Sequence, residues 1–196
     1  AMTLQPDVMT LNSIIERAAV ESLGRQQYRV LFIAAGEIGT AENPPGSNAG
    51  PVLRYGGKPG QPWCAWFVCH CFHAAIGRWP AKMNHQTGGT GTLLAAAKRA
   101  TCVFPKPEPG DIAYKPRFDG KGKKIGGHVG LVAAVSPDGK HVLSIEGNRG
   151  DAVRVQVRFT SEWRWFIRGP YSTFQQPRLW LGWPDAPPEG AVEVEA

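Results

Sequence analysis

The amino-acid sequence predicts an α+β domain in which N-terminal helices pack on an antiparallel β-sheet. Apolar residues recur at helical spacing through much of the first hundred residues, and the pattern becomes extended after Pro109 and Gly110. Turn-forming residues then separate several short apolar segments, as in a meander of strands. With 196 residues, the chain is long enough for one domain with a hydrophobic core and additional structure at its ends.

The first half of the chain is expected to hold four helices separated by loops. Residues 8–36 form two of them, because apolar residues recur at helical spacing from Val8 to Ala19 and again over residues 26–35. Residues 63–76 are apolar and free of glycine and proline, which predicts a buried helix that ends at Gly77. The fourth helix is expected over residues 90–99, and the turn-rich stretches 42–50 and 56–62 are loops.

The second half is expected to form the sheet. The predicted strands cover residues 111–114, 128–135, 141–146, 153–159 and 163–167. Pro137, Asp138 and Gly139 form the turn that makes a hairpin of the second and third of these strands. Before residue 128 the chain carries an insertion rich in glycine and basic residues, which we expect to be a mobile, solvated loop.

Composition and charge limit the classes of function. The net charge of +6 favours anionic partners, but the chain has no aromatic-basic motif typical of a nucleic-acid reader, so no nucleic-acid partner is expected. No stretch approaches the about 20 apolar residues of a membrane span, and the N-terminus lacks the basic and apolar regions of a signal peptide. We therefore expect a protein made in the cytoplasm without a cleaved signal.

Cys64 is the strongest candidate for a reactive residue. It lies in the first turn of the helix expected over residues 63–76, where the helix dipole and free backbone N–H groups favour the thiolate. Its own backbone N–H is also placed to stabilise an oxyanion. The alternative interpretation is a small buried core residue, because free cysteine is among the most buried residue types.

Two later segments supply the partners that a nucleophilic cysteine needs. His128 follows two glycines and starts a predicted strand, and a neutral imidazole there can accept the thiol proton. Glu146 and Asn148 end the neighbouring strand and share one face if that strand continues. Either side chain can fix the tautomer of His128, which is the third role in a catalytic triad. The alternatives are an exposed strand start for His128 and turn formation for residues 146–148.

The other cysteines and histidines allow several interpretations. The segment Cys69-His70-Cys71-x-His73 resembles a metal cluster, but on a helix most of these side chains point in different directions. We therefore predict no metal site there. Four cysteines are too few for a disulfide framework, and the pairing of Cys69, Cys71 and Cys102 stays open.

Five motifs in order carry a resemblance to a known family. They are ENPPGSN (residues 42–48), GQPWCAWFV (60–68), PEPGDIAY (107–114), GHVGLV (127–132) and SIEGN (144–148). These motifs are similar to those of the CHAP domain, the cysteine, histidine-dependent amidohydrolase/peptidase type, which is related to the NlpC/P60 peptidoglycan hydrolases. The resemblance implies a papain-like catalytic domain over residues 27–170, with residues 1–26 as a helical extension and 171–196 as a peripheral tail.

The resemblance also implies an activity and the residues that perform it. The expected reaction is hydrolysis of an amide bond in peptidoglycan, with Cys64 as nucleophile and His128 as general base. Glu146 is expected to orient His128, with Asn148 in a supporting role.

Further expectations concern the surroundings of Cys64. Gln61 is the candidate for helping to stabilise the oxyanion, and Trp63 is expected to form a wall of the substrate cleft. The basic insertion, with Arg117, Lys121, Lys123 and Lys124, is expected to border the same cleft. Some relatives bind calcium through an acidic loop before the cysteine, but residues 42–48 hold a single carboxylate, so we expect no calcium site and no cofactor.

The sequence allows more than one scissile bond and more than one biological setting. The enzyme is expected to be an N-acetylmuramoyl-L-alanine amidase or a stem-peptide endopeptidase that reaches the cell wall after lysis or by dedicated export. It would act as a phage lysin or as an exported antibacterial effector, and an effector would have a cognate immunity protein as partner. The alternatives are a cysteine amidase or deamidase of a non-wall substrate and a non-catalytic wall-binding module.

Overall fold

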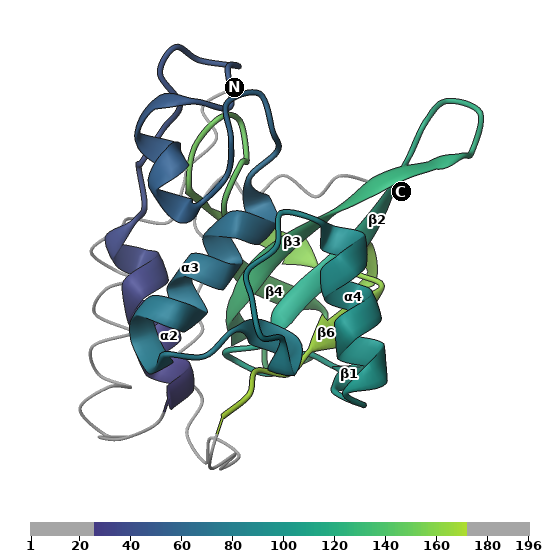
Figure 1. Cartoon of the computed structure of the whole chain (residues 1–196). Helices are drawn as coiled ribbons and strands as arrows, with labels where there is room; N and C mark the ends of the chain where they lie inside the picture. Colours follow the sequence, from purple (N-terminus) through teal and green to yellow (C-terminus); the bar gives the residue numbers. More distant parts are fainter. Residues whose placement is uncertain (1–25, 172–196) are drawn as a thin grey trace.

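The computed structural model describes residues 26–171, and its α-helices precede its strands as expected (Figure 1). The helices are α2 (Gln26–Gly36), α3 (Cys64–Ile76) and α4 (Thr90–Arg99), and short 3-10 helices lie at Gly50–Tyr55, Pro80–Lys82 and Thr160–Glu162. The helix expected over residues 8–19 lies outside the described residues. So do the expected N-terminal extension and C-terminal tail, apart from one residue at the inner end of each.

The strands form one six-stranded antiparallel sheet in the order β1-β6-β2-β3-β4-β5. Their bounds are β1 Val103–Phe104, β2 Ile112–Phe118, β3 Lys124–Val135, β4 His141–Glu146, β5 Arg154–Phe159 and β6 Trp165–Ile167. Strands β2 to β5 follow one another as the expected meander, whereas β6 returns to pair with β1 and β2. The short strand β1 was not anticipated from the sequence. The expected α+β class is confirmed.

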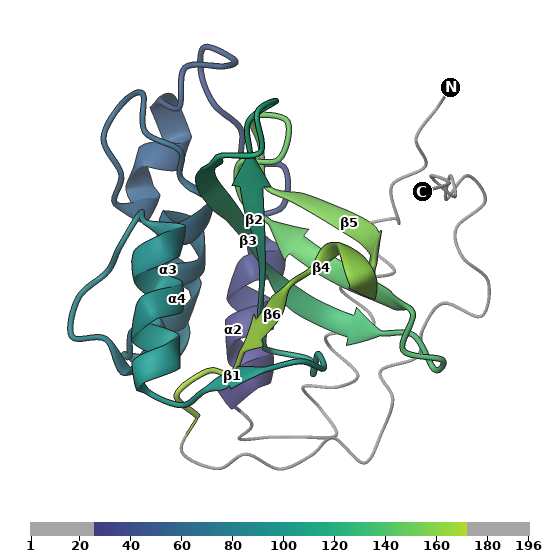
Figure 2. The same cartoon turned by 90° about the vertical axis from the view of Figure 1, so that its right-hand side faces the viewer.

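The core lies between the helices and the sheet, with α3 and α4 on one side of the sheet in Figure 2. Helix α3 packs against both α2 and β3, and its buried Phe67 and Phe72 belong to the same cluster as Leu131 of β3. The helix ends where expected, since Gly77 adopts a left-handed conformation with φ 64°. This packing holds the N-terminal end of α3 close to the middle of the sheet.

The β2–β3 hairpin differs from the expectation. Much of the basic insertion is strand rather than loop, because β2 continues to Phe118 and β3 already begins at Lys124, so the hairpin projects from the body of the domain (Figure 1). The register pairs Lys115 with His128, which therefore lies within β3 and not at its start. Glycine weakens a strand without excluding it, and here β3 pairs with β2 along this segment.

The turn-rich loop over residues 42–50 is held by a buried carboxylate. Glu42 accepts a hydrogen bond from the backbone N–H of Asn48 at 2.7 Å and another from the indole N–H of Trp63 at 2.8 Å. The loop is thereby attached to the residue just before α3. Between Gln26 and Tyr171 no helix is both long enough and apolar enough to cross a membrane.

Candidate active site

Cys64 is the first residue of α3, and it lies at a cavity of about 630 Å³. Pro62 precedes the helix, and the N-cap residue Trp63 makes no side-chain capping hydrogen bond. Backbone N–H groups in a first turn have no partner within the helix, so they remain available near the thiol. Only 5% of Cys64 is exposed, and that exposed part lies toward the cavity.

His128 lies between Cys64 and a carboxylate. Its Nε2 is 2.8 Å from Oε2 of Glu146, and a second hydrogen bond joins the ring to Cys64. Because Nε2 is engaged by Glu146, the other ring nitrogen, Nδ1, is the atom available to the thiol. The structure therefore brings together three of the residues expected from the sequence in one chain of contacts.

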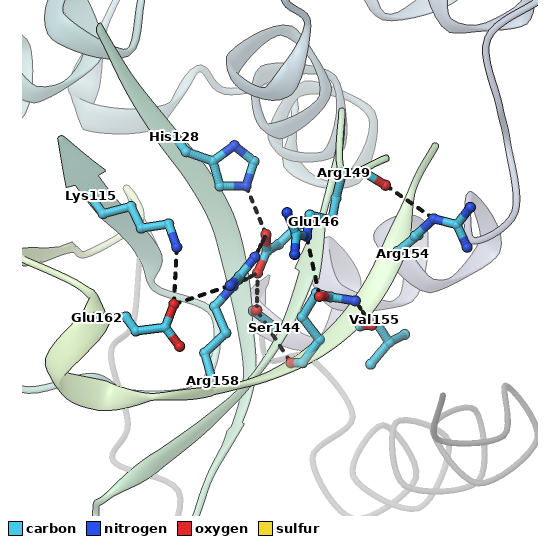
Figure 3. Close-up of polar contacts among 10 residues, drawn as sticks. Lys115, His128, Ser144, Glu146, Arg149, Arg154, Val155, Arg158 and Glu162 are labelled. Carbon is cyan, nitrogen blue, oxygen red and sulfur yellow. Dashed lines mark hydrogen bonds and ion pairs between the residues drawn. The ribbon is translucent and has the colours of Figure 1, made fainter. Parts of the chain in front are cut away.

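Glu146 is the last residue of β4, is fully buried, and receives hydrogen bonds from three side chains (Figure 3). Besides His128, the Ser144 hydroxyl donates to Oε1 at 2.7 Å. Arg158 of β5 binds the carboxylate with two nitrogens, Nε to Oε1 and Nη2 to Oε2 at 2.8 Å. Such a bidentate pair constrains both the position and the plane of a carboxylate.

These contacts control the ionisation of Glu146 and His128. Burial alone raises the pKa of Glu146, but hydrogen bonds from Arg158 and His128 outweigh it and lower the pKa to about 2. Burial lowers the pKa of His128, whereas hydrogen bonds to Cys64 and Glu146 raise it, and the net pKa lies above its usual value. Glu146 therefore stays ionised at neutral pH and favours the protonated imidazole.

Residues 56–148, just under half of the chain, match the family model of the CHAP domain. This chain contains a CHAP domain. The matched segment includes Cys64, His128 and Glu146, and it ends before β5. No curated protein and no solved structure matched the chain. As a family, CHAP domains are hydrolases of the cysteine, histidine-dependent amidohydrolase/peptidase type, and they act on peptidoglycan.

Arg158 contacts Glu146 from beyond the matched segment, and its place at the site was not anticipated from the sequence. The alternation of β5 showed that Arg158 shares a strand face with Arg154, but an arginine on a half-buried strand usually faces solvent. The register pairs Arg158 with Val142 of β4, four pairs away from Glu146. The guanidinium reaches along the strands to the carboxylate, and its Nη1 also contacts Glu162 at 3.1 Å.

Asn148 is placed away from this chain of contacts. Strand β4 ends at Glu146, and Asn148 adopts a left-handed conformation with φ 57°, so the two side chains do not continue one strand face. Its amide donates to Oδ1 of Asn48 at 2.9 Å. In this position Asn148 connects the end of β4 to the loop over residues 42–50.

Of the two residues expected beside the substrate, Gln61 lies at the cavity and Trp63 does not. Trp63 is 1% exposed and donates to Glu42, so it lies in the core and does not face the cavity. Trp66, in the first turn of α3, lines the cavity instead. Gln61 is exposed and lines the same cavity next to Cys64, so its amide can reach a bound substrate.

The remaining cysteines are separate from the site and unpaired. Cys69 and Cys71 are fully buried, and burial raises the pKa of Cys69 to about 11 and that of Cys71 well above its usual value. Burial also raises the pKa of Cys102. Among residues 26–171 no group of three or more histidine, cysteine or acidic side chains is arranged to hold a metal ion.

Gly130 allows Glu146 to occupy its position, which leads to a first prediction. A Cβ at Gly130 would lie 2.7 Å from Cγ of Glu146 and 3.3 Å from the carbonyl oxygen of Ile145. We expect Gly130→Ala to displace the carboxylate, to lower kcat at least about tenfold and to cost about 1–3 kcal/mol of stability. Turnover of a peptide amide and urea denaturation measure the two effects.

Gly120→Ala is the matched control for this variant. A Cβ at Gly120 meets nothing within 4 Å, and its φ requires no glycine. The control should therefore retain wild-type kcat and stability. Equal activity of both variants would contradict the placement of Glu146 against β3.

Proposed function

We propose that this protein is a peptidoglycan hydrolase that cleaves an amide bond, with Cys64 as nucleophile, His128 as general base and Glu146 as orienting residue. The observation that carries the proposal is the hydrogen-bonded order Cys64–His128–Glu146 at a cavity in a CHAP domain. This order contains a nucleophile, a base within hydrogen-bond reach and a group that orients the base.

The first half of the reaction follows from these contacts. His128 Nδ1 accepts the proton of Cys64 while the sulfur attacks the amide carbonyl carbon. The negative charge that develops on the carbonyl oxygen is stabilised by backbone N–H groups at the start of α3, with Gln61 as a further donor. The C–N bond then breaks, the amine leaves with the proton from His128, and a thioester remains on Cys64.

The second half regenerates the enzyme. His128 accepts a proton from a water molecule whose oxygen attacks the thioester carbonyl, and the proton returns to the Cys64 sulfur as the C–S bond breaks. The product is a carboxylic acid. Throughout both halves, Glu146 remains ionised, because its pKa of about 2 lies far below that of the imidazolium to which it binds.

The substrate bond that we propose is either the muramoyl–L-alanine amide or an amide within the stem peptide. The protein would act as a phage lysin or as an exported antibacterial effector, and an effector would be neutralised in the producing cell by a cognate immunity protein. The net charge of +6 supports an encounter with the anionic cell wall in either setting.

Digestion of purified sacculi tests the proposal. We expect wild-type protein to release fragments in which mass spectrometry finds one new amine and one new carboxyl group at a single type of amide. The Cys64→Ala variant should release none. Unchanged sacculi, combined with a Cys64 that still reacts with iodoacetamide, would contradict a wall substrate and favour an amide elsewhere.

A further inference from the structure

Arg117 is the only charged side chain among the described residues that line the cavity at Cys64. The rest of the lining consists of glycines and of uncharged side chains, including Gln61, Thr90 and Ile125. A cavity with a single fixed positive charge and no acidic lining residue is electrostatically suited to an anionic group.

The strand register leaves the guanidinium uncovered. Arg117 lies in β2 directly opposite Gly126 of β3, and a glycine offers no side chain to pack over its cross-strand neighbour. Arg117 itself is exposed. The guanidinium is thus accessible from the cavity.

The carboxylates around the site already have partners. Glu146 binds Arg158 and His128, and Glu162 binds Lys115 and Arg158 at 3.1 Å each. Asp119, two residues beyond Arg117, accepts the backbone N–H groups of residues 121 and 123 at 2.9 Å. Within residues 26–171 no side-chain hydrogen bond or ion pair engages the Arg117 guanidinium, in contrast to the side chains of Arg158 and Lys115.

We propose that Arg117 binds a carboxylate of the substrate next to the scissile amide, so that the site takes acidic peptides. This inference rests on the proposed function for the identity of the peptide, because stem peptides of peptidoglycan carry free carboxylates. Arginine suits the task, since its planar guanidinium can form two parallel hydrogen bonds with one carboxylate. Arg117 is therefore a specificity-determining residue outside the triad.

The neighbouring lysines do not share this role. Lys121, Lys123 and Lys124 belong to the same hairpin and are exposed, but none of them lines the cavity. Lys124 lies over the ring of Tyr114, with Nζ 5.7 Å from the centroid. The whole basic insertion was expected to border the substrate cleft, but of its four basic residues only Arg117 lines the cavity. The lysines therefore provide matched controls.

Alkylation of Cys64 tests the charge at the cavity without any assumption about the natural substrate. Iodoacetate carries a carboxylate, whereas iodoacetamide is its neutral counterpart, and both transfer their methylene carbon to sulfur with loss of iodide. The readout is the ratio of the two rates at Cys64, followed by peptide mass spectrometry so that Cys102 does not contribute. The ratio cancels any change in the reactivity of Cys64 itself.

Arg117→Gln should lower the iodoacetate-to-iodoacetamide ratio by about two- to fivefold, the range of an exposed ion pair. Arg117→Lys and Lys123→Gln should keep the wild-type ratio. Added salt should reduce the difference between wild type and Arg117→Gln. A ratio that Arg117→Gln leaves unchanged would overturn the proposal.

Paired peptides test the specificity itself. With stem peptides that differ only in a free or amidated carboxylate, Arg117→Gln should raise KM for the free acid by about two- to fivefold and leave KM for the amide unchanged. Equal effects on both peptides would overturn the proposal. If the alkylation ratio falls but no wall peptide is cleaved by wild type, the anion site stands and the proposed function fails.

Discussion

Replacing Cys64 with alanine is expected to lower turnover by at least about 10⁴-fold. Among residues 26–171, Cys64 is the only cysteine that lines the cavity, and its side chain is the one hydrogen-bonded to His128 on the side away from Glu146. Without the sulfur, no thioester forms and the remaining groups can only bind the substrate. Release of soluble fragments from sacculi by wild type and variant measures the loss.

The fold should tolerate this change, which separates chemistry from stability. The substitution removes one sulfur atom next to a cavity, so we expect a melting temperature close to that of the wild type. Cys102→Ala is the control, because Cys102 is also a free thiol but lies away from the site. It should retain full turnover. Wild-type turnover by Cys64→Ala would exclude every enzymatic interpretation that uses this cysteine.

Glu146→Gln is expected to have the second largest effect, on both activity and stability. A glutamine no longer stabilises the imidazolium form of His128, so kcat should fall by about 10²–10⁴-fold. The variant also removes the buried carboxylate partner of Arg158, whose side chain is 10% exposed and keeps only its ion pair with the more exposed Glu162. Breaking such a buried pair costs about 3–5 kcal/mol, which urea denaturation would measure.

A double variant distinguishes the two effects of this substitution. Glu146→Gln combined with Arg158→Gln removes both charges, and we expect it to recover part of the lost stability but none of the lost turnover. The control is Glu162→Gln, because the Glu162 side chain is 37% exposed and its ion pairs contribute at most about 1 kcal/mol. Normal turnover in Glu146→Gln would contradict the role of the carboxylate.

The stability of the wild type should also depend on pH through Glu146. Its pKa is lowered from 4.5 to about 2 in the folded state, so ionised Glu146 stabilises the fold above pH 4.5 and this contribution is lost as pH falls toward 2. Between pH 6 and pH 3.5 the stability advantage of wild type over Glu146→Gln should therefore shrink by about 1 kcal/mol. An advantage that does not change with pH would contradict the lowered pKa.

The nucleophile and its helix could be predicted because their evidence is local in the sequence. An apolar run without glycine or proline, between Pro62 and Gly77, predicts the bounds of α3 and places Cys64 in its first turn. His128 and Glu146 could be proposed because each lies in a recognisable strand and in a motif of the family. The contact between His128 and Glu146 depends on the antiparallel pairing of β3 and β4, which the hairpin turn between these strands predicts.

The rest of the site depends on register and packing that one sequence does not reveal. Arg158 reaches Glu146 only because β5 pairs with β4 in the observed register. The sequence could not show that Asn148 lies away from His128 while Glu146 contacts it. The left-handed conformation of Asn148, just after β4, leaves no pattern in the apolar spacing. Trp63 and Trp66 are three residues apart, and only the structure shows that a hydrogen bond to Glu42 holds Trp63 in the core while Trp66 lines the cavity.

The central claim is that Cys64 carries the acyl group of the substrate during turnover. The most direct test is acid quenching of wild-type protein during digestion of a purified stem peptide, followed by peptide mass spectrometry. We expect the peptide containing Cys64 to gain the mass of the acyl fragment as a thioester that hydroxylamine removes, and Cys64→Ala to show neither adduct nor cleavage. Cleavage by Cys64→Ala at the wild-type rate, or an acyl adduct on another residue, would contradict the account.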